Sequence, residues 1–320
     1  MHILILGAAG MIGRRLTKRL IAEGKLGETP IDKITTFDVF PSQIHSDEIR
    51  IEDIAGDVAD RSTIESLILD RPDVIIHLAA VVSGEAEADF DKGYHVNLDG
   101  TRQLFEMIRA QEDYHPRVVF TSSIAVYGAP FSGAISDEFL LAPMSSYGTQ
   151  KAICELLLND YSRRGIFDGI GIRLPTIVVR PGKPNKAASS FFSGIIREPL
   201  AGLEAVLPVD DSVKSWLASP DAAAGFLIHA ATLDTAPLGA RRCLNMPGVA
   251  VTVAGMIEAL REVAGDAPVA RIRREPDPAV RAIVDNWPEE FDPARALALG
   301  FTADPDFASI IRAHLRDQQK

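Results

Sequence analysis

A tyrosine and a lysine four residues apart are the residues of this sequence best suited to acid–base chemistry. Tyr147 and Lys151 lie in the segment Ser-Ser-Tyr-Gly-Thr-Gln-Lys, and on a helix this spacing places both side chains on one face. A lysine ammonium beside a phenol favours the phenolate and draws the phenol pKa down from its usual value of about 10. The phenolate could then accept the proton of a substrate alcohol while hydride leaves the same carbon.

A serine at the end of an apolar run could assist that reaction. Ser123 closes the segment Thr121-Ser122-Ser123, which follows the apolar residues 118–121. Ligands bind at the carboxyl ends of the strands in doubly wound folds, so Ser123 could hydrogen-bond the reacting oxygen. Alone, Tyr-x-x-x-Lys is usually an exposed helical pair. Together with Ser123 and a nucleotide site, it predicts hydride transfer.

The nucleotide site is predicted from a glycine-rich turn near the start of the chain. Gly7, Gly10 and Gly13 lie between an apolar run and a helical pattern that opens with Met11 and Ile12. Glycines there permit a tight turn, close approach of a pyrophosphate and close packing of helix on strand. The N–H groups at the helix start would bind the phosphates. Tight turns also use glycine for steric reasons alone, so the position between strand and helix carries the prediction.

An acidic residue at the end of the second strand favours NAD over NADP. Asp38 follows Thr-Thr-Phe, where a carboxylate can accept hydrogen bonds from the adenosine ribose and repel a 2′-phosphate. The alternative is an acid that faces water at the end of a strand. The spacing from Gly13 is long, and residues 25–30 are the expected cause. Arg14 and Arg15 leave minor use of NADP open.

Two further segments are candidates for cofactor contacts. Asp57, followed by Val58, comes after a third strand and could lie near the adenine amine. Leu78, Ala79 and Ala80 end the fourth strand, where small residues let the backbone pass close to a cofactor. A solvated turn explains Asp57 nearly as well, and ordinary packing explains the alanines nearly as well.

The surrounding pattern predicts an α/β protein with a Rossmann-type, doubly wound parallel sheet. Short apolar runs alternate with helical segments through the first half of the chain, as expected for strands covered on both faces. The predicted strands are residues 2–6, 34–38, 74–78, 118–121 and 169–174. We expect residues 1–173 to form the NAD-binding domain, with 216–245 returning to it, and residues 174–320 to form mainly a smaller α/β substrate domain.

Composition excludes several other classes of function. The chain has 33 Lys and Arg against 44 Asp and Glu, a net charge of -11, which disfavours nucleic acids and anionic membrane surfaces as partners. Cys154 and Cys243 fit no metal or redox spacing and are expected to be small core residues, so no metal site is predicted. The N-terminal residues lack the pattern of a signal peptide. The protein is expected to be cytoplasmic.

The motifs, taken in order, resemble those of the extended short-chain dehydrogenase/reductase superfamily. They are the glycine turn at 7–13, Asp38, Asp57, residues 77–80, Asn97 in Asn-Leu-Asp-Gly-Thr, residues 121–128, and Tyr147 with Lys151. The resemblance implies that Tyr147 is the acid/base, that Lys151 also holds the nicotinamide ribose, and that Asn97 steadies the active-site helix and a water. It adds Thr121, Ser122, Pro175 and Thr176 to the cofactor contacts. It also implies a homodimer.

Within that superfamily the chain looks most like the D-erythronate dehydrogenase family. That resemblance is carried by Arg-Leu-Pro-Thr at 173–176, Gly-Lys-Pro at 182–184, and Trp-Leu-Ala-Ser-Pro at 216–220. It implies oxidation of a small sugar acid, D-erythronate, at C2. Arg180, Lys183 and Lys186 could bind the acid group, or they could belong to a solvated loop. Trp216 could line the pocket, although a core position is commoner.

Two other functions stay open at this point. Nucleotide-sugar epimerases and dehydratases use the same tyrosine and lysine but return the hydride to their substrate. They typically carry an Asn where this chain has Thr176, which argues against a sugar nucleotide. A non-catalytic dinucleotide-sensing protein is the third possibility. Such relatives often lose the tyrosine or the lysine, and this chain keeps both.

Overall fold

The computed structural model describes residues 1–182 and 189–318, and the chain divides into two compact units. The first comprises Met1–Val126, Pro143–Arg173 and Ala224–Leu244, and the second Tyr127–Ala142, Leu174–Ala223 and Asn245–Lys320. The sequence-based division places residues 127–142 in the first domain, whereas the structure groups them with the second. The physical reason is pairing with residues distant in sequence: the Tyr127 hydroxyl donates to Asn245 Oδ1 at 2.8 Å, and Ile135 bridges to Phe291.

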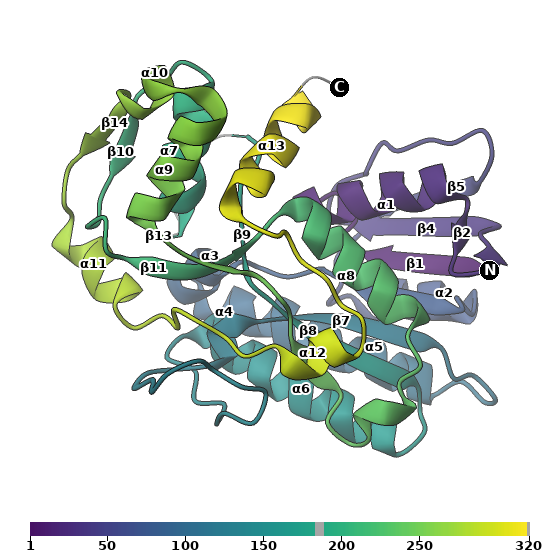
Figure 1. Cartoon of the computed structure of the whole chain (residues 1–320). Helices are drawn as coiled ribbons and strands as arrows, with labels where there is room; N and C mark the ends of the chain where they lie inside the picture. Colours follow the sequence, from purple (N-terminus) through teal and green to yellow (C-terminus); the bar gives the residue numbers. More distant parts are fainter. Residues whose placement is uncertain (183–188, 319–320) are drawn as a thin grey trace. The chain divides into compact units, whose positions relative to one another are not determined.

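The first unit is built on a seven-stranded sheet, in which the neighbouring pairs from β5 to β7 are parallel (Figure 1). The strand order is β12-β8-β7-β6-β1-β4-β5. The strands are β1 (His2–Leu6), β4 (Lys33–Asp38), β5 (Arg50–Ala55), β6 (Val74–His77), β7 (Arg117–Ser123), β8 (Asp168–Leu174) and β12 (Cys243–Asn245). The chain order reverses between β1 and β6, so a crevice is expected at their carboxyl ends. The predicted doubly wound α/β fold is confirmed.

Helices cover both faces of this sheet. In Figure 1, α1 and α8 lie over one face, and α2, α5 and α6 over the other. The helices of this part of the chain are α1 (Met11–Glu23), α2 (Arg61–Leu69), α3 (Ser83–Ala88), α4 (Phe90–Gly93), the π-helical η1 (Tyr94–Asp99), α5 (Gly100–Arg109), η2 (Ile124–Val126), α6 (Ser146–Arg163), α8 (Pro220–Thr232) and η3 (Ala236–Leu238). The long connection between Gly13 and Asp38 contains a small hairpin of β2 (Lys25–Leu26) and β3 (Thr29–Pro30).

The second unit has its own apolar core, formed by helices packed beside two small sheets. One sheet joins β9 (Thr176–Ile177), β11 (Lys214–Ala218) and β13 (Val249–Thr252), and the other joins β10 (Ala205–Leu207) and β14 (Ile272–Arg274). The helices are α7 (Ser190–Leu200), α9 (Val253–Ala264), α10 (Asp266–Val269), α11 (Pro278–Val284), α12 (Ala294–Ala298) and α13 (Phe307–Gln318). Because β11 belongs to this unit, the return to the first unit begins at Ala224 rather than at Trp216.

Side-chain caps and a glycine mark the boundaries of helices in this half of the chain. Ser219 Oγ accepts from the Ala222 N–H at 3.0 Å at the start of α8. Thr252 Oγ1 caps α9 through the Gly255 N–H at 3.1 Å, and Gly265 ends that helix with a φ of 80°. Such side-chain oxygens satisfy backbone donors that have no partner within the helix.

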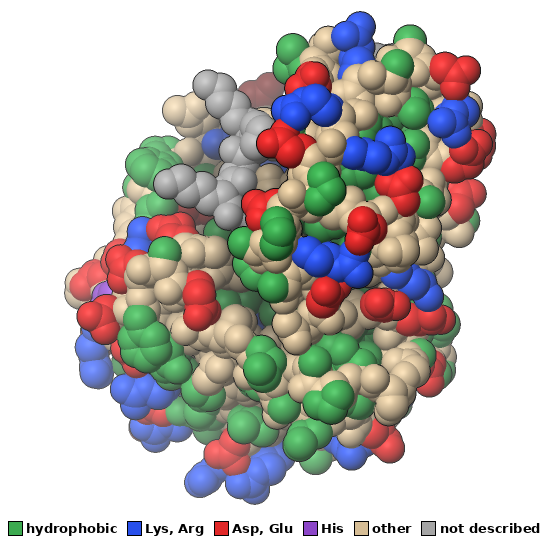
Figure 2. All heavy atoms as spheres, turned by 90° about the vertical axis from the view of Figure 1, so that its left-hand side faces the viewer, with side chains coloured by type: hydrophobic (Ala, Val, Ile, Leu, Met, Phe, Trp, Pro, Cys, Tyr) green, Lys and Arg blue, Asp and Glu red, His purple; other side chains and the backbone are tan. Residues whose placement is uncertain are grey.

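The surface in Figure 2 shows Lys and Arg side chains interspersed with Asp and Glu. Both cysteines are buried in the core of the first unit, as predicted. Within residues 1–182 and 189–318, no helix is long and apolar enough to cross a membrane.

Candidate active site and dinucleotide site

The glycine turn has the geometry that a dinucleotide site requires. Gly7 has a φ of 89°, and a Cβ on it would lie 2.6 Å from the Ala79 backbone nitrogen. A Cβ on Gly13 would lie 2.3 Å from the Gly7 carbonyl oxygen, so helix α1 can approach the strand only without a side chain there. Gly10 is exposed at the start of α1, which has no side-chain cap. The N–H groups of Met11 and Ile12 can therefore serve a phosphate.

Asp38 lies against this turn. Its Oδ2 accepts from the Ala9 N–H at 2.9 Å, and its Oδ1 accepts from the Val39 N–H at 2.7 Å. The Arg14 guanidinium donates to the carbonyl oxygens of Ala9 and Ser42, at 2.8 and 2.7 Å. The carboxylate is thus fixed beside the turn, where it can accept from ribose hydroxyls. These residues fit NAD.

We expect Asp38→Ala to reduce the preference for NAD over NADP. The substitution removes an acceptor for the ribose hydroxyls and a negative charge that repels a 2′-phosphate. The KM for NAD should rise about tenfold or more, the cost of one charge-assisted hydrogen bond, and kcat should change less. Initial-rate kinetics with both cofactors measure the effect. A wild-type enzyme that prefers NADP would contradict this role for Asp38.

The structure shows where the other residues predicted to contact the cofactor lie. Their contacts with the cofactor stay predictions. Asp57 is exposed, and its Oδ1 accepts from the Ala59 N–H at 2.9 Å. Val58 is buried and lies against Gly100. Leu78 and Ala79 pass directly behind Gly7, and Ala80 follows them. The close approach of the two chain segments explains why small residues stand here.

Tyr147 and Lys151 lie on the first two turns of α6, as predicted. The helix is capped by Ser145, whose Oγ accepts from the Gly148 N–H at 3.1 Å. Lys151 Nζ lies 5.8 Å from the centroid of the Tyr147 ring. It donates to the Thr121 carbonyl oxygen at 2.8 Å and lies 4.7 Å from the centroid of the Phe120 ring. The ammonium group is therefore held between the tyrosine and the end of β7.

Burial changes the acidity of this lysine. The Lys151 side chain is removed from water, and desolvation lowers its pKa to about 8, against the opposing influence of Cys154 and Glu155. The lysine is accordingly protonated below about pH 8. A positive charge in this position stabilises a phenolate on Tyr147.

The chain brings Ser123 toward the same place. Ser123 ends β7 and is half-buried, and its Oγ accepts from the Ala125 N–H at 3.1 Å. A Cβ on Gly148 would lie 2.1 Å from the Ala125 carbonyl oxygen. Because Gly148 is next to Tyr147 and Ala125 is two residues after Ser123, the first turn of α6 packs directly on the serine's loop.

Asn97 is buried in the π-helical turn η1, a type of helical irregularity that is frequent at functional sites. Its Nδ2 donates to the Val81 carbonyl oxygen at 3.0 Å and to Gln150 Oε1 at 2.7 Å, and its Oδ1 accepts from the Val81 N–H at 2.8 Å. Asn97 thus joins the loop after β6 to α6. This geometry matches a steadying role for the active-site helix, and contact with a water stays a prediction.

The predicted residues of the second unit are held by local contacts. Pro175 precedes Thr176, which begins β9. The Arg180 guanidinium donates to the Ile177 carbonyl oxygen at 2.9 Å and to Ser189 Oγ at 3.4 Å.

Trp216 is buried, donates from Nε1 to the Met246 carbonyl oxygen at 3.1 Å and contacts Phe291. The functions proposed for these residues stay predictions, and Lys183 and Lys186 lie outside the described residues.

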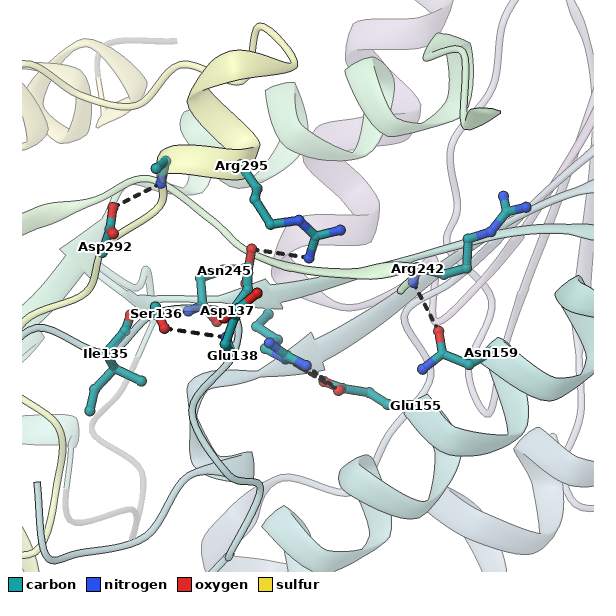
Figure 3. A network of polar contacts seen from close by, with 12 residues as sticks. Ile135, Ser136, Asp137, Glu138, Glu155, Asn159, Arg242, Asn245, Asp292 and Arg295 are labelled. Carbon is teal, nitrogen blue, oxygen red and sulfur yellow. Dashed lines mark hydrogen bonds and ion pairs between the residues drawn. The ribbon is translucent and has the colours of Figure 1, made fainter. Parts of the chain in front are cut away.

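Two further residues near the site, His77 and Glu155, are assigned no role by the sequence patterns. His77 is fully buried, and burial together with the Lys151 charge lowers its pKa to about 3, so its ring is neutral. Its Nε2 pairs with Thr101 Oγ1 at 2.9 Å. Glu155, labelled in Figure 3, lies one turn beyond Lys151 and pairs with Arg173. The spacing of Tyr147, Lys151 and Glu155 at four-residue intervals is the sequence signal that could have pointed to Glu155.

Comparisons with known proteins agree with this geometry. The NAD dependent epimerase/dehydratase family matches residues 3–240. The D-erythronate dehydrogenase of Cupriavidus necator is 49% identical over 99% of this chain and 98% of its own length. The D-erythronate dehydrogenase of Haemophilus influenzae is 42% identical over 98% of both chains. A solved structure described as the nucleoside-diphosphate-sugar epimerase from Agrobacterium tumefaciens is 57% identical, with a TM-score of 0.97 over 100% of this chain and 94% of that one.

These matches confirm the resemblance to extended short-chain dehydrogenases/reductases and the predicted cofactor, NAD. They extend through both units, since the two D-erythronate dehydrogenases align over nearly the full chain.

Proposed function

We propose that this chain, which belongs to the NAD dependent epimerase/dehydratase family, oxidises the C2 hydroxyl of D-erythronate to give 2-dehydro-D-erythronate. The observation that carries the proposal is the 49% identity, over nearly the whole of both chains, to a D-erythronate dehydrogenase. The hydrogen bond from Lys151 to the Thr121 carbonyl oxygen supports it, because that bond holds the positive charge of Lys151 between the end of β7 and the Tyr147 ring.

In the proposed reaction, bound NAD supplies the acceptor for the hydride that leaves C2. The Tyr147 phenolate takes the proton of the C2 hydroxyl, and the Lys151 ammonium stabilises the phenolate. Ser123 donates a hydrogen bond to the same substrate oxygen. The glycine turn, with Asp38, holds the adenosine and pyrophosphate part of the cofactor. Asn97 keeps α6 in register with the loop that follows β6.

The acid group of the substrate needs a cation once water is excluded, because an unpaired buried charge is costly. We assign this function to Arg180, which is permanently charged and can form two parallel hydrogen bonds to a carboxylate. Its bond to the Ile177 carbonyl oxygen fixes the guanidinium in the second unit. Lys183 and Trp216 complete the proposed substrate contacts.

A panel assay tests the proposed function. The purified protein is mixed with NAD and one alcohol at a time, and NADH absorbance is followed. D-Erythronate should give the highest kcat/KM, and its methyl ester, which lacks the charge, should be a poor substrate. Absence of NADH formation with D-erythronate at saturating NAD would contradict the proposal.

A nucleotide-sugar epimerase is the second candidate, favoured by the description of the 57% identical Agrobacterium tumefaciens structure. Such an enzyme would interconvert UDP-sugars without added NAD and would retain its cofactor tightly. Thr176 occupies the position where an Asn is typical of those enzymes, which favours the dehydrogenase. Incubation with UDP-glucose in the absence of added NAD separates the two candidates.

The homodimer and the cytoplasmic location are part of the proposal. The dimer is supported by the resemblance to the superfamily, in which a four-helix interface is common. Leu156 on α6 is consistent with it, since this large apolar residue is 63% exposed. Sedimentation equilibrium measures the oligomeric state.

A further inference from the structure

A buried ion pair lies directly behind the proposed catalytic lysine. The Arg173 guanidinium donates to both oxygens of Glu155, from Nη2 to Oε2 at 2.7 Å and from Nε to Oε1 at 2.9 Å. The side chains are 6% and 1% exposed. Ser122 Oγ donates to the same Glu155 Oε1. The three residues come from β8, α6 and β7, and Figure 3 shows Glu155 projecting from its helix into this ion pair.

Such a pair is not explained by stability alone. Removing two charges from water is costly, and apolar residues of similar size often serve a core as well or better. A role in the reaction would explain why Glu155 is buried here, and its position beside the proposed catalytic residues suggests such a role. It follows Lys151 by one helical turn, and Ser122 precedes Ser123 by one residue.

The end of β7 is tied to α6 at two successive residues. Lys151 Nζ donates to the Thr121 carbonyl oxygen, and Glu155 accepts from the Ser122 hydroxyl. Arg173 holds Glu155 from β8, the strand next to β7 in the sheet. These ties fix Ser123, at the end of β7, relative to Tyr147, at the start of α6. Both residues must address one substrate oxygen, so a small displacement between them reduces the rate.

We propose that Glu155 and Arg173 are positioning residues for the reaction: they hold Ser123 and Lys151 in place and balance the charge around Tyr147 and Lys151. This inference rests on the proposed function for its kinetic test. The ionisable groups that face Lys151 are Tyr147, Cys154 and Glu155 on its own helix and His77 from β6, while β7 presents Phe120 and Thr121. Within residues 1–182 and 189–318, Glu155 is the carboxylate that acts on the charge of Lys151.

Charge variants make opposite predictions for the two partners. Glu155→Gln removes a negative charge, which lowers the pKa of both Tyr147 and Lys151, so the pH profile of kcat/KM should shift about one unit toward acid. Arg173→Met removes a positive charge and should shift the profile about one unit toward alkali. Each variant should also lower kcat about tenfold, because one tie between β7 and α6 is weakened.

Two changes that leave the net charge unaltered separate the effect of these residues on the position of Ser123 and Lys151 from their effect on the pH profile. They also test whether a single variant merely fails to fold. The double variant Glu155→Gln/Arg173→Met leaves no buried charge without a partner, so it should fold, regain the wild-type pH profile and keep a reduced kcat. Ser122→Ala should lower kcat without moving the profile. The matched control is Asp168→Asn, which breaks the ion pairs of Asp168, at the start of β8, with Arg117, at the start of β7, and with Arg242, just before β12. It should leave the profile unchanged.

A second readout does not depend on the substrate. Ultraviolet titration of tyrosinate, taken as the difference between each protein and its Tyr147→Phe counterpart, reports the Tyr147 pKa without D-erythronate. Opposite shifts for Glu155→Gln and Arg173→Met in this titration support the inference, even if D-erythronate is not the substrate. The inference would be overturned if both single variants moved the Tyr147 pKa in the same direction, or if neither variant moved it. It would also be overturned if Asp168→Asn moved that pKa as much as the single variants do.

Discussion

We expect the Tyr147→Phe variant to oxidise D-erythronate about 10²–10⁴-fold more slowly than the wild type, the usual span for a lost general base. The phenyl ring keeps the packing of the side chain but cannot accept the substrate proton. The affinity for NAD should stay near the wild-type value, because the hydroxyl is the only group removed. Steady-state turnover and a titration with NAD that displaces fluorescent NADH measure the two quantities.

The matched control lies on the same helix. Tyr161→Phe removes a hydroxyl that bonds to Glu106 rather than one beside Lys151, and kcat should change less than twofold or so. If Tyr147→Phe and Tyr161→Phe have equal turnover, Tyr147 has no part in the proton transfer.

The second large effect is expected for Arg180→Ala. Loss of the cation that pairs with a buried carboxylate should raise the KM for D-erythronate about 10²-fold or more, while the affinity for NAD stays close to the wild type. The KM for the methyl ester of D-erythronate should differ less between the wild type and Arg180→Ala, because the ester carries no charge for Arg180 to pair with.

Arg274→Ala is the control, since Arg274 belongs to the same unit and forms an exposed ion pair with Asp211. Its KM should match that of the wild type. Equal KM values for wild type and Arg180→Ala, or equal turnover of acid and ester by the wild type, would remove Arg180 from substrate binding.

Local patterns were sufficient to predict five strands of the sheet, β1, β4, β6, β7 and β8, together with the cofactor turn. The run His2–Leu6 is almost wholly apolar because helices cover both faces of the sheet (Figure 1), so that Ile3, Leu4, Ile5 and Leu6 are at most 1% exposed. Such runs can be recognised without knowledge of their partner strands. Gly7 and Gly13 are needed because neighbouring backbone leaves no room for a Cβ. The constraint on Gly13 comes from Gly7 and Ala8, which are close in sequence, whereas the constraint on Gly7 comes from Ala79, which is distant in sequence.

Contacts between distant residues could not be predicted in the same way. Asn97 and Gln150 are 53 residues apart and meet only because α6 packs against η1. Arg173 reaches Glu155 only because β8 lies beside β7. The placement of residues 127–142 in the second unit depends on Asn245, which follows more than a hundred residues later. Sequence spacing carries no record of such pairings.

Transfer of deuterium from C2 of D-erythronate to NAD tests the central claim most directly. The wild-type protein is incubated with NAD and D-erythronate deuterated at C2, and the released nicotinamide cofactor and the sugar acid are analysed by mass spectrometry. The proposed reaction predicts one deuterium in each released NADH and none in the 2-dehydro-D-erythronate formed with it. Recovery of all the deuterium in the sugar acid, with no labelled NADH in solution, would contradict it.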